Sequence, residues 1–380
     1  MNIDSIKKIE LEITSDCNAA CPGCTRTRFP DLLKIQSFSL TDIKRLFPTQ
    51  KEIANKEFKF CGVLGDPTVH PELLDMVKYL TSNLGYCEIS TNGGYQNVTW
   101  WRELGDISAS TKLVQVVFAV DGHKETNHLY RVNTVFDVIE RNMAAYALGG
   151  KGSAWATWMF IVFDHNEYEL ETAQQNAVRL GFNFATRTGI RNTVNDWVAK
   201  LPKKDAITKT VIKEDFVITT SDDKAHSKVA QVTELQHFIN TYSKSTEVVP
   251  IIGKATGNIV NDESTRKRIL NSIVCKLVHE GEIFIASDLT LWPCCFLWQL
   301  AHTNKDEFLK LTKDFKSGWN SLANNSIDEI LAHEWFSTLL EASWDPSHKM
   351  HIEKCIRTCG NNKAYQNEIK FINDNTYTNI

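Results

Sequence analysis

Cysteine is the residue type in this 380-residue chain whose spacing most clearly points to chemistry, and ten cysteines are present. Cys17, Cys21 and Cys24 lie close together near the start. Five more lie near the other end: Cys275, Cys294, Cys295, Cys355 and Cys359. In a reducing compartment, grouped cysteines indicate metal binding or catalysis more often than disulfides. Because no cysteine lies between residues 88 and 274, the groups predict two separate sites.

The first group has the spacing of a metal-cluster site. Three neighbouring thiolates can bind three irons of a four-iron cluster and leave the fourth iron open to another ligand. A zinc site would need a fourth nearby Cys or His, and the next histidine is His70. Zinc binding and chance clustering remain open as alternatives. The other two cysteines, Cys61 and Cys87, stand singly in apolar runs, which is typical of small buried side chains.

The composition narrows the class of protein. With 42% hydrophobic residues the chain can form a substantial core, and 42 basic against 46 acidic side chains give a net charge of −4. That balance argues against a strongly basic nucleic-acid-binding surface, although it allows a local basic patch. No run approaches the about 18 apolar residues of a membrane span, and the first residues lack a secretory signal. We therefore expect a soluble cytoplasmic protein with no membrane partner.

Strand and helix signals alternate through the first half of the chain with a period of roughly 30 residues. Strand-like runs are Ile6–Thr14, Glu57–Leu64, Tyr86–Ser90, Leu113–Val120, Ala154–Phe163 and Asn183–Thr188. Helix-like runs between them are Leu40–Phe47, Pro71–Leu84, Thr99–Leu104, Val135–Leu148 and Glu169–Leu180. Six such repeats predict a parallel sheet with right-handed crossovers, either doubly wound or curled toward a barrel.

The spacing C-x3-C-x2-C directly after the first strand resembles the radical S-adenosylmethionine (SAM) superfamily. In that family the open iron binds the amino and carboxylate groups of SAM, and an electron from the reduced cluster cleaves SAM to methionine and a 5′-deoxyadenosyl radical. The resemblance implies a partial (β/α)6 parallel barrel, SAM as cofactor, and a low-potential electron donor of the flavodoxin or ferredoxin type. One departure is Gly23, where many relatives carry an aromatic residue.

Segments after the second and third strands resemble SAM-binding elements of the family. Gly65-Asp66-Pro67 resembles its Gly-Gly-Glu-Pro segment, whose backbone and acid meet the SAM ammonium group. Here Leu64 replaces the first glycine, and Asp66 is one methylene shorter than glutamate. Ser90-Thr91-Asn92-Gly93 resembles the Thr-Asn-Gly element. Both segments are also ordinary turn sequences. The candidate cofactor-binding residues here are Gly65, Asp66, Pro67, Ser90 and Asn92.

Segments after the fourth and fifth strands continue the resemblance. Ala119-Val-Asp121-Gly122, followed by Arg131, resembles a Ser-Leu-Asp-Gly…Arg segment in which the serine touches the SAM ribose and the arginine pairs with the SAM carboxylate. Ala119 lacks the hydroxyl group, whereas Arg131 keeps a charge that could make this contact. Asn166 stands where relatives place a polar contact to SAM, and it also suits a turn or a helix cap. Asp121, Arg131 and Asn166 complete the candidate cofactor-binding residues.

The second cysteine group resembles a SPASM/twitch extension, which holds an auxiliary four-iron cluster. Residues 282–294 read as a β-hairpin, and Ser326 with Glu329 as the capping box of a helix that runs toward Leu340. A full SPASM domain holds two clusters with about seven cysteines, so five favour the shorter twitch form. Leu289 occupies the position of a family glycine at the hairpin turn. The resemblance implies four ligands, on the hairpin and on a loop after the helix: Cys275, Cys294, Cys355 and Cys359.

One choice within that set stays open, because Cys295 could exchange roles with Cys294. Zinc also remains an alternative for this group.

These readings divide the chain into four parts. Residues 1–191 form the predicted partial barrel, and residues 271–362 a small α+β cysteine-rich auxiliary-cluster domain. Between them, residues 192–270 read as a polar bridging or insertion segment with one helix near Val229–Ser243, and residues 363–380 as a polar tail. The first strand begins by about residue 6, so we expect no fused module for gripping a leader peptide.

The resemblance implies hydrogen abstraction from a substrate, with an auxiliary cluster that aids substrate oxidation or binding. A peptide or protein substrate has a slight lead, and a dehydrogenase or epimerase of a small polar metabolite is the alternative. From another class, the chain could be a non-catalytic iron–sulfur electron carrier or sensor. Release of 5′-deoxyadenosine from SAM would discriminate these classes. The sequence leaves open the substrate, the catalytic acid or base, the fate of SAM and the oligomeric state.

Overall fold

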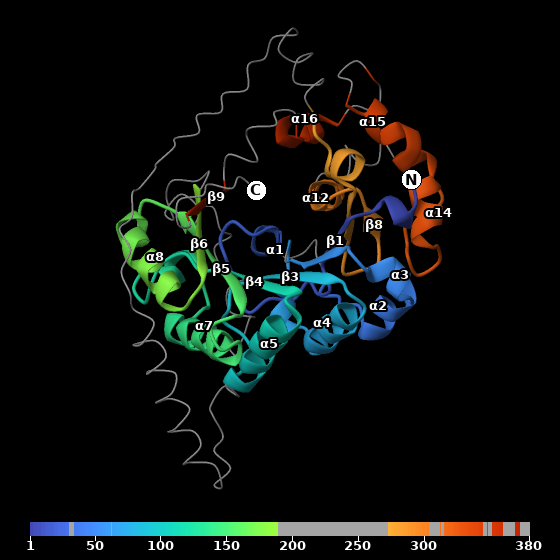
Figure 1. Cartoon of the computed structure of the whole chain (residues 1–380). Helices are drawn as coiled ribbons and strands as arrows, with labels where there is room; N and C mark the ends of the chain where they lie inside the picture. Colours follow the sequence, from blue (N-terminus) through green and yellow to red (C-terminus); the bar gives the residue numbers. More distant parts are fainter. Residues whose placement is uncertain are drawn as a thin grey trace.

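A mixed β-sheet runs through the computed structural model (Figure 1). The structure describes residues 1–29, 34–61, 63–188, 273–303, 312, 315–344, 348, 352–359 and 369–372. Within these residues the sheet has nine strands in the order β8-β7-β1-β2-β3-β4-β5-β6-β9. Neighbours from β7 to β6 are parallel, whereas β8 and β9 pair antiparallel at the two edges.

The α/β fold class predicted from the sequence is confirmed, and each predicted strand of the first half is present. The strands are β1 Lys8–Leu11, β2 Glu57–Phe60, β3 Tyr86–Thr91, β4 Val114–Ala119, β5 Trp155–Val162 and β6 Asn183–Thr188. The predicted helices are α2 Leu40–Leu46, α4 Leu73–Ser82, α5 Val98–Thr111, α7 Phe136–Gly149 and α8 Leu170–Arg179. Shorter elements are η1 Ile3–Ser5, α1 Thr25–Arg28, α3 Gln50–Ile53, η3 Pro67–Val69, α6 Asn127–Tyr130 and η4 Glu167–Glu169.

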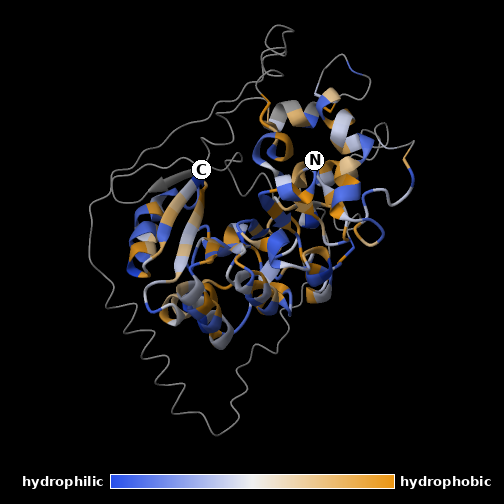
Figure 2. Ribbon diagram, turned by 45° about the vertical axis from the view of Figure 1, so that its right-hand side comes forward, coloured by the Kyte–Doolittle hydropathy of each residue, from blue (hydrophilic) through white to orange (hydrophobic). Residues whose placement is uncertain are grey.

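The sheet has an apolar face against the helices and a charged face opposite. On the helix side, Phe58 of β2 packs edge-on against Phe47, and Phe118 of β4 packs against Trp101 of α5. Because side chains alternate along a strand, the residues between these point the other way. There Glu10, Lys59 and Glu88 lie in register across β1, β2 and β3. Figure 2 shows hydrophobic and hydrophilic residues together along the helices, as expected for helices with one buried side.

The C-terminal hairpin extends the same sheet. It consists of β7 (Glu282–Ile285) and β8 (Leu291–Trp292), and β7 pairs in parallel with β1, with Ile9 opposite Ile283. At the hairpin turn Leu289 has φ 61°, a left-handed conformation that glycine adopts at lower cost. The helices around the hairpin are η6 Lys276–Glu280, α12 Cys295–Thr303, α14 Ile327–Ala332, η7 Trp335–Leu339, α15 Leu340–Ala342 and α16 Glu353–Cys359.

Three expectations for the C-terminal part need correction or refinement. Ser326 and Glu329 form the predicted capping box, but α14 ends at Ala332 and the chain continues as η7 and α15. Cys355 and Cys359 lie on helix α16 instead of on a loop after a helix. Within the predicted polar tail, β9 (Ile369–Ile372) pairs antiparallel with β6. The bridging segment 192–270 and its expected helix lie outside the described residues.

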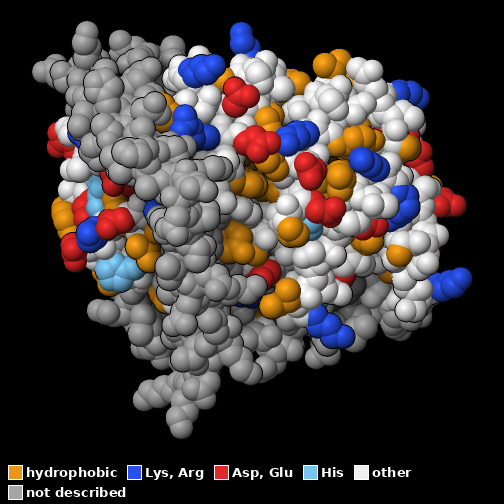
Figure 3. Space-filling model, turned by 90° about the horizontal axis from the view of Figure 1, so that it is seen from below, with side chains coloured by type: hydrophobic (Ala, Val, Ile, Leu, Met, Phe, Trp, Pro, Cys, Tyr) orange, Lys and Arg blue, Asp and Glu red, His pale blue; other side chains and the backbone are white. Residues whose placement is uncertain are grey.

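The surface and the helices agree with the composition. Acidic and basic side chains are interspersed over the described part of the face in Figure 3. Among the described helices, none has the length and apolar character needed to cross a bilayer.

Candidate cofactor and metal-binding sites

The first cysteine group lies on the loop that leaves β1 and ends in α1. The Arg26 guanidinium donates a hydrogen bond to the Cys17 carbonyl at 3.1 Å, and the Cys24 amide donates to the Cys21 carbonyl at 3.0 Å. The Ala20 amide donates to the Val132 carbonyl at 2.9 Å, which fastens the loop to the segment after β4. The three cysteines are half-buried, between the surface of the loop and the protein interior.

Each of these thiols faces a different strand-end segment. The Asn92 side-chain amide, after β3, lies 3.8 Å from the Cys17 sulfur. The Arg131 Nη1 atom, after β4, lies 3.9 Å from the Cys21 sulfur. The Cys24 sulfur lies 3.9 Å from the Val63 carbonyl oxygen, after β2. Segments far apart in the sequence therefore meet around one cysteine loop, at the carboxyl ends of the parallel strands.

Polar donors around the thiols suit ligands of a metal cluster. Burial raises the pKa of Cys17, and the nearby charges of Asp66 and Cys21 raise it further. Buried thiolates therefore need positive charge or hydrogen-bond donors to persist. The Ala19 amide supplies one donor at 3.3 Å from the Cys17 sulfur, and Asn92 and Arg131 supply others.

The described residues contain no group of three or more His, Cys, Asp or Glu side chains that could hold one metal ion. A four-iron cluster binds each thiolate to a separate iron and so does not require the sulfurs to meet around one ion.

Asp66 lies at the predicted place but both of its carboxylate oxygens are occupied. Oδ1 accepts hydrogen bonds from the Thr68 amide and hydroxyl and from the Thr91 hydroxyl, at 2.6–3.0 Å. Oδ2 accepts from the Thr91 hydroxyl at 3.0 Å and from the Asn92 amide at 2.7 Å. A carboxylate has about four lone-pair sites, and these bonds use them. Asp66 thus joins the end of β2 to the end of β3 and caps η3, which begins at Pro67.

Gly65 is placed against the cysteine loop. A Cβ atom at this position would lie 2.0 Å from the Thr14 carbonyl oxygen, so no other residue fits without moving the backbone. The Asp66 amide also donates to the Asp16 carbonyl at 2.8 Å. Ser90 is half-buried on β3 opposite Val117 of β4.

Asp121, Arg131 and Asn166 form a connected group after β4 and β5. The Arg131 Nε atom donates to Asp121 Oδ2 at 2.6 Å, and the Ile161 amide donates to Asp121 Oδ1 at 2.7 Å. Burial raises the pKa of Asp121 although Arg131 acts to lower it. The Asn166 amide donates to the carbonyls of Asp121 and Ile161, so this side chain ties the two strand ends together. The Nη1 end of Arg131 is directed at the cysteine loop.

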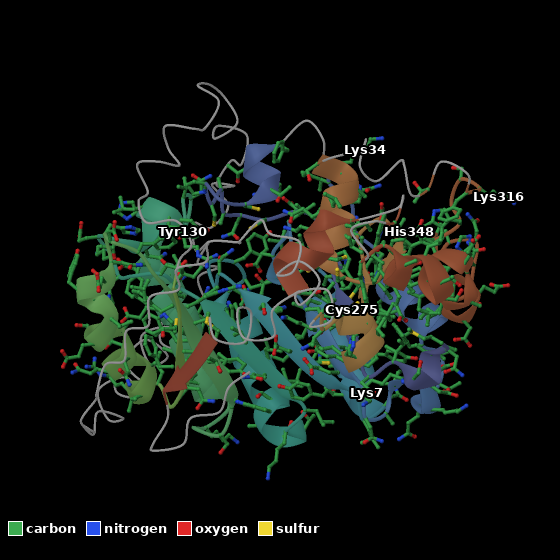
Figure 4. All side chains as sticks on the ribbon, turned by 90° about the horizontal axis from the view of Figure 1, so that it is seen from above. Lys7, Lys34, Tyr130, Cys275, Lys316 and His348 are labelled. Atoms are coloured by element: carbon green, nitrogen blue, oxygen red, sulfur yellow. The ribbon has the colours of Figure 1, made fainter. Side chains whose placement is uncertain are left out.

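The second cysteine group forms a pocket of its own. One pocket is lined by all four predicted ligands, namely Cys275, Cys294, Cys355 and Cys359, together with apolar residues that include Phe296 and Trp344. Cys355 and Cys359 are four residues apart on α16, a spacing that places both on one face of a helix. The Val274 amide donates to the Cys359 carbonyl at 3.1 Å and holds α16 beside η6. Figure 4 labels Cys275 among the orange C-terminal elements and Tyr130 among the teal and green elements.

Cys295 has a different environment from Cys294. Its thiol lies near the Glu10 carboxylate of β1, and Cys61 donates a hydrogen bond to the same carboxylate at 3.2 Å. Burial alone would raise the pKa of Glu10, but the ammonium groups of Lys276 and Lys59 lower it. Adjacent cysteines at the start of α12 thus point to the pocket and to β1 respectively. This arrangement favours Cys294 over Cys295 as the fourth ligand.

The chain was compared with protein-family models, with curated proteins and with solved structures. No protein-family model matches the chain. The tungsten-containing aldehyde ferredoxin oxidoreductase cofactor-modifying protein of Pyrococcus furiosus is 31% identical over 120 residues, which are 30% of this chain and 31% of that protein. The match therefore spans less than a third of that relative's length.

Similar solved structures include two of SuiB from Streptococcus suis. SuiB bound to SAM is 12% identical with a TM-score of 0.46 and covers 90% of this chain and 67% of its own. SuiB bound to the precursor peptide SuiA has the same TM-score of 0.46 and 12% identity, over 79% of this chain and 62% of that one. The protein anSMEcpe with bound SAM is 14% identical, with a TM-score of 0.44 over 87% and 78% of the two chains.

Sequence reasoning missed several residues that organise these sites. Glu10 on β1 and Glu12 directly after it are buried at alternate positions, a pattern that could have indicated two acids facing inward. Arg26, two residues after the last cysteine of the motif, holds the Cys17 and Ala19 carbonyls. No local signal marked Gln299 of α12, whose amide donates to the Thr25 hydroxyl of α1 and so joins the second site to the first.

Proposed function

We propose that this chain is a radical SAM enzyme. The observation that carries the proposal is the environment of Cys17, Cys21 and Cys24. These thiols share one loop, and each faces a separate strand-end segment with a polar group within 4.0 Å. Such an arrangement suits a cluster with an open iron and a polar ligand above it. When bound, the cluster and SAM would supply reductive cleavage of the cofactor and a 5′-deoxyadenosyl radical that abstracts hydrogen from a substrate.

The chain's own residues would position SAM in this proposal. The Arg131 guanidinium is directed at the cysteine loop and can bind the SAM carboxylate, while Asp121 holds its other end. The backbone at Leu64, Gly65 and Asp66 lies beside the same loop and would receive the ammonium group. Ser90, Asn92 and Asn166 are proposed as further residues of the cofactor site, through contact or through support of the loops.

We further propose that Cys275, Cys294, Cys355 and Cys359 hold an auxiliary four-iron cluster. Their common pocket supports this ligand set. A peptide or protein substrate, an electron donor of the flavodoxin or ferredoxin type and a cytoplasmic location stay part of the proposal on the sequence resemblance.

The test is anaerobic reconstitution followed by reduction with dithionite in the presence of SAM. We expect about eight irons and eight sulfides per chain, together with release of 5′-deoxyadenosine. The matched control is Cys21→Ala. This variant should bind about four irons and should release no 5′-deoxyadenosine. Stoichiometric zinc with little iron would contradict the cluster assignment. Two clusters without 5′-deoxyadenosine would favour an electron carrier or sensor instead.

A further inference from the structure

Glu12 is a buried acid beside the boundary between β1 and the C-terminal hairpin strand β7. It follows β1, its side chain is 0% exposed, and its amide donates to the Ile285 carbonyl of β7 at 2.9 Å. One carboxylate oxygen accepts a hydrogen bond from the Leu64 amide at 2.6 Å. The other oxygen is buried and has no partner in the described part of the chain. The most influential charged groups near it are acidic, Glu10 on β1 and Asp288 on the hairpin turn.

The hydrogen bond from Leu64 fixes the direction of a peptide group. The Val63–Leu64 bond belongs to a chain whose described residues contain no cis peptide. In a trans peptide the amide N–H and the carbonyl C=O point to opposite sides. With the Leu64 N–H directed at Glu12, the Val63 carbonyl points away from it, and its oxygen lies 3.9 Å from the Cys24 sulfur.

Other contacts prevent the loop from turning freely. Gly65 lies against the Thr14 carbonyl, where a Cβ atom would come within 2.0 Å. The Asp66 amide donates to the Asp16 carbonyl at 2.8 Å. Glu12, Thr14 and Asp16 therefore contact successive residues of the 64–66 segment from the same side. Of these contacts, Glu12 supplies the side-chain acceptor that sets the orientation of the first peptide group.

We propose that Glu12 is a positioning residue for SAM, which orients the Val63–Leu64 peptide so that the Val63 carbonyl oxygen accepts a hydrogen bond from the SAM ammonium group. This inference rests on the proposed function. Asp66 cannot easily supply that acceptor, because protein donors already occupy its carboxylate. A carbonyl held in place costs little reorganisation when the ligand binds.

The experiment compares Glu12→Gln with Glu12→Leu in the reconstituted protein. Glutamine keeps an oxygen that can accept from the Leu64 amide, whereas leucine has a similar size and no acceptor. Two ligands are measured by equilibrium dialysis: SAM, and 5′-methylthioadenosine, which has the nucleoside and sulfur but no amino-acid group. Iron content and melting temperature are recorded for each protein. Glu88→Leu, an acid-to-leucine change on β3 away from the cysteine loop, is the matched control.

We expect Glu12→Leu to weaken SAM binding about tenfold or more, the effect of losing about one well-placed hydrogen bond. Its affinity for 5′-methylthioadenosine and its iron content should match the wild type. Glu12→Gln and Glu88→Leu should both bind SAM nearly as tightly as the wild type does. If Glu12→Leu takes up no iron, Glu12→Met, with an unbranched chain and only a weak acceptor, replaces it in the same comparison.

Two results would overturn the inference and leave the proposed function intact. One is a folded Glu12→Leu protein with wild-type affinity for SAM. The other is an equal loss of affinity for both ligands, which would indicate a general structural role. Failure of the wild-type protein to bind SAM would instead reject the proposed function itself.

Discussion

At the scale of single residues, the acids of the strand-end motifs accept hydrogen bonds mainly from groups of the protein itself, so they have little capacity left to bind a ligand directly. Asp66 binds Thr68, Thr91 and Asn92, and Asp121 binds Arg131 and the Ile161 amide. The family motif has glutamate where this chain has Asp66, and the shorter acid is close enough to its own loop to cap η3. Groups directed at the cysteine loop include the Arg131 guanidinium, the Asn92 side-chain amide and the backbone after β2.

Arg131 gives the first residue-scale prediction. Replacing it by alanine removes a charge-assisted contact worth about 1.5–3 kcal/mol, so SAM affinity should fall roughly tenfold or more. Arg131→Lys keeps the charge but loses the forked geometry, and it should bind SAM with intermediate affinity. Asp66→Ala should also weaken SAM binding, because it releases the loop. Equilibrium dialysis with iron-loaded protein measures all three. Wild-type affinity in both alanine variants would contradict the site.

The paired cysteines before α12 give the second residue-scale prediction. Cys294 lines the pocket with the other three proposed ligands, whereas Cys295 lies near the Glu10 carboxylate. Cys294→Ala should therefore lose about four irons, and Cys295→Ala should retain about eight. Iron and sulfide analysis of the two reconstituted variants decides between them. The opposite pattern would show that Cys295 is the ligand.

At the scale of elements, the sequence predicted the positions of strands β1 to β6 well and the ends of the helices less well. Period-two alternation and apolar runs located β1 to β6 because each is bounded by turns. The helix predicted to end at Leu104 continues to Thr111 as α5. Gly105 lies in its middle because a Cβ atom there would come 2.0 Å from the Tyr146 carbonyl of α7. The local sequence does not distinguish a glycine that allows two helices to pack closely from a glycine that ends a helix.

Pairing between distant segments could not be predicted either. The sequence indicated a hairpin at residues 282–294, but its place beside β1 depends on contacts made across more than 250 residues. Helix α16 was missed for a similar reason. Seven residues, two of them cysteines, form a weak helix signal, and α16 is positioned by Val274 and by the wall of the pocket.

Helix α16 leads to a prediction about division of labour. Cys355→Ala/Cys359→Ala should lose about four irons and still release 5′-deoxyadenosine from SAM, since the first site draws on other residues. Cys21→Ala should show the reverse: it should keep the second cluster and release no 5′-deoxyadenosine. Measuring both variants side by side, with iron content as the control for folding, tests the separation. If the α16 variant binds SAM but cannot cleave it, the second cluster supplies electrons to the first.

At the scale of the whole molecule, β1 connects the two sites. Two buried acids lie at alternate positions here. Glu10 of β1 lies near Cys295 beside the second site, and Glu12, directly after β1, accepts a hydrogen bond from the loop beside the first. The order of strands makes this possible, because β1 lies between β2 and β7. Gln299 of α12 and Thr25 of α1 add a second connection. The two proposed sites therefore share one continuous core.

Burying Glu12 in that core has a consequence for the stability of the whole protein. Burial raises the pKa of Glu12 to about 8 from an ordinary 4.5. Between these values the folded protein retains a proton that the unfolded chain has released, so the free energy of unfolding decreases as pH rises. The decrease begins near the unfolded pKa and is complete above about pH 8, and it amounts to a few kcal/mol.

Glu12→Gln removes this titration while keeping the shape of the side chain. The melting temperatures of the wild-type protein and of Glu12→Gln should therefore lie closest at about pH 5, move apart as pH rises to about 8, and stay a constant distance apart above it, with the variant more stable. Other titrating groups are common to both proteins, so they cancel in the difference between the two melting curves. Thermal unfolding of the two reconstituted proteins in matched buffers gives this difference directly. A difference that does not change with pH would mean that Glu12 is ionised in the folded protein, and that the 64–66 loop is held by a carboxylate instead of by a neutral acid.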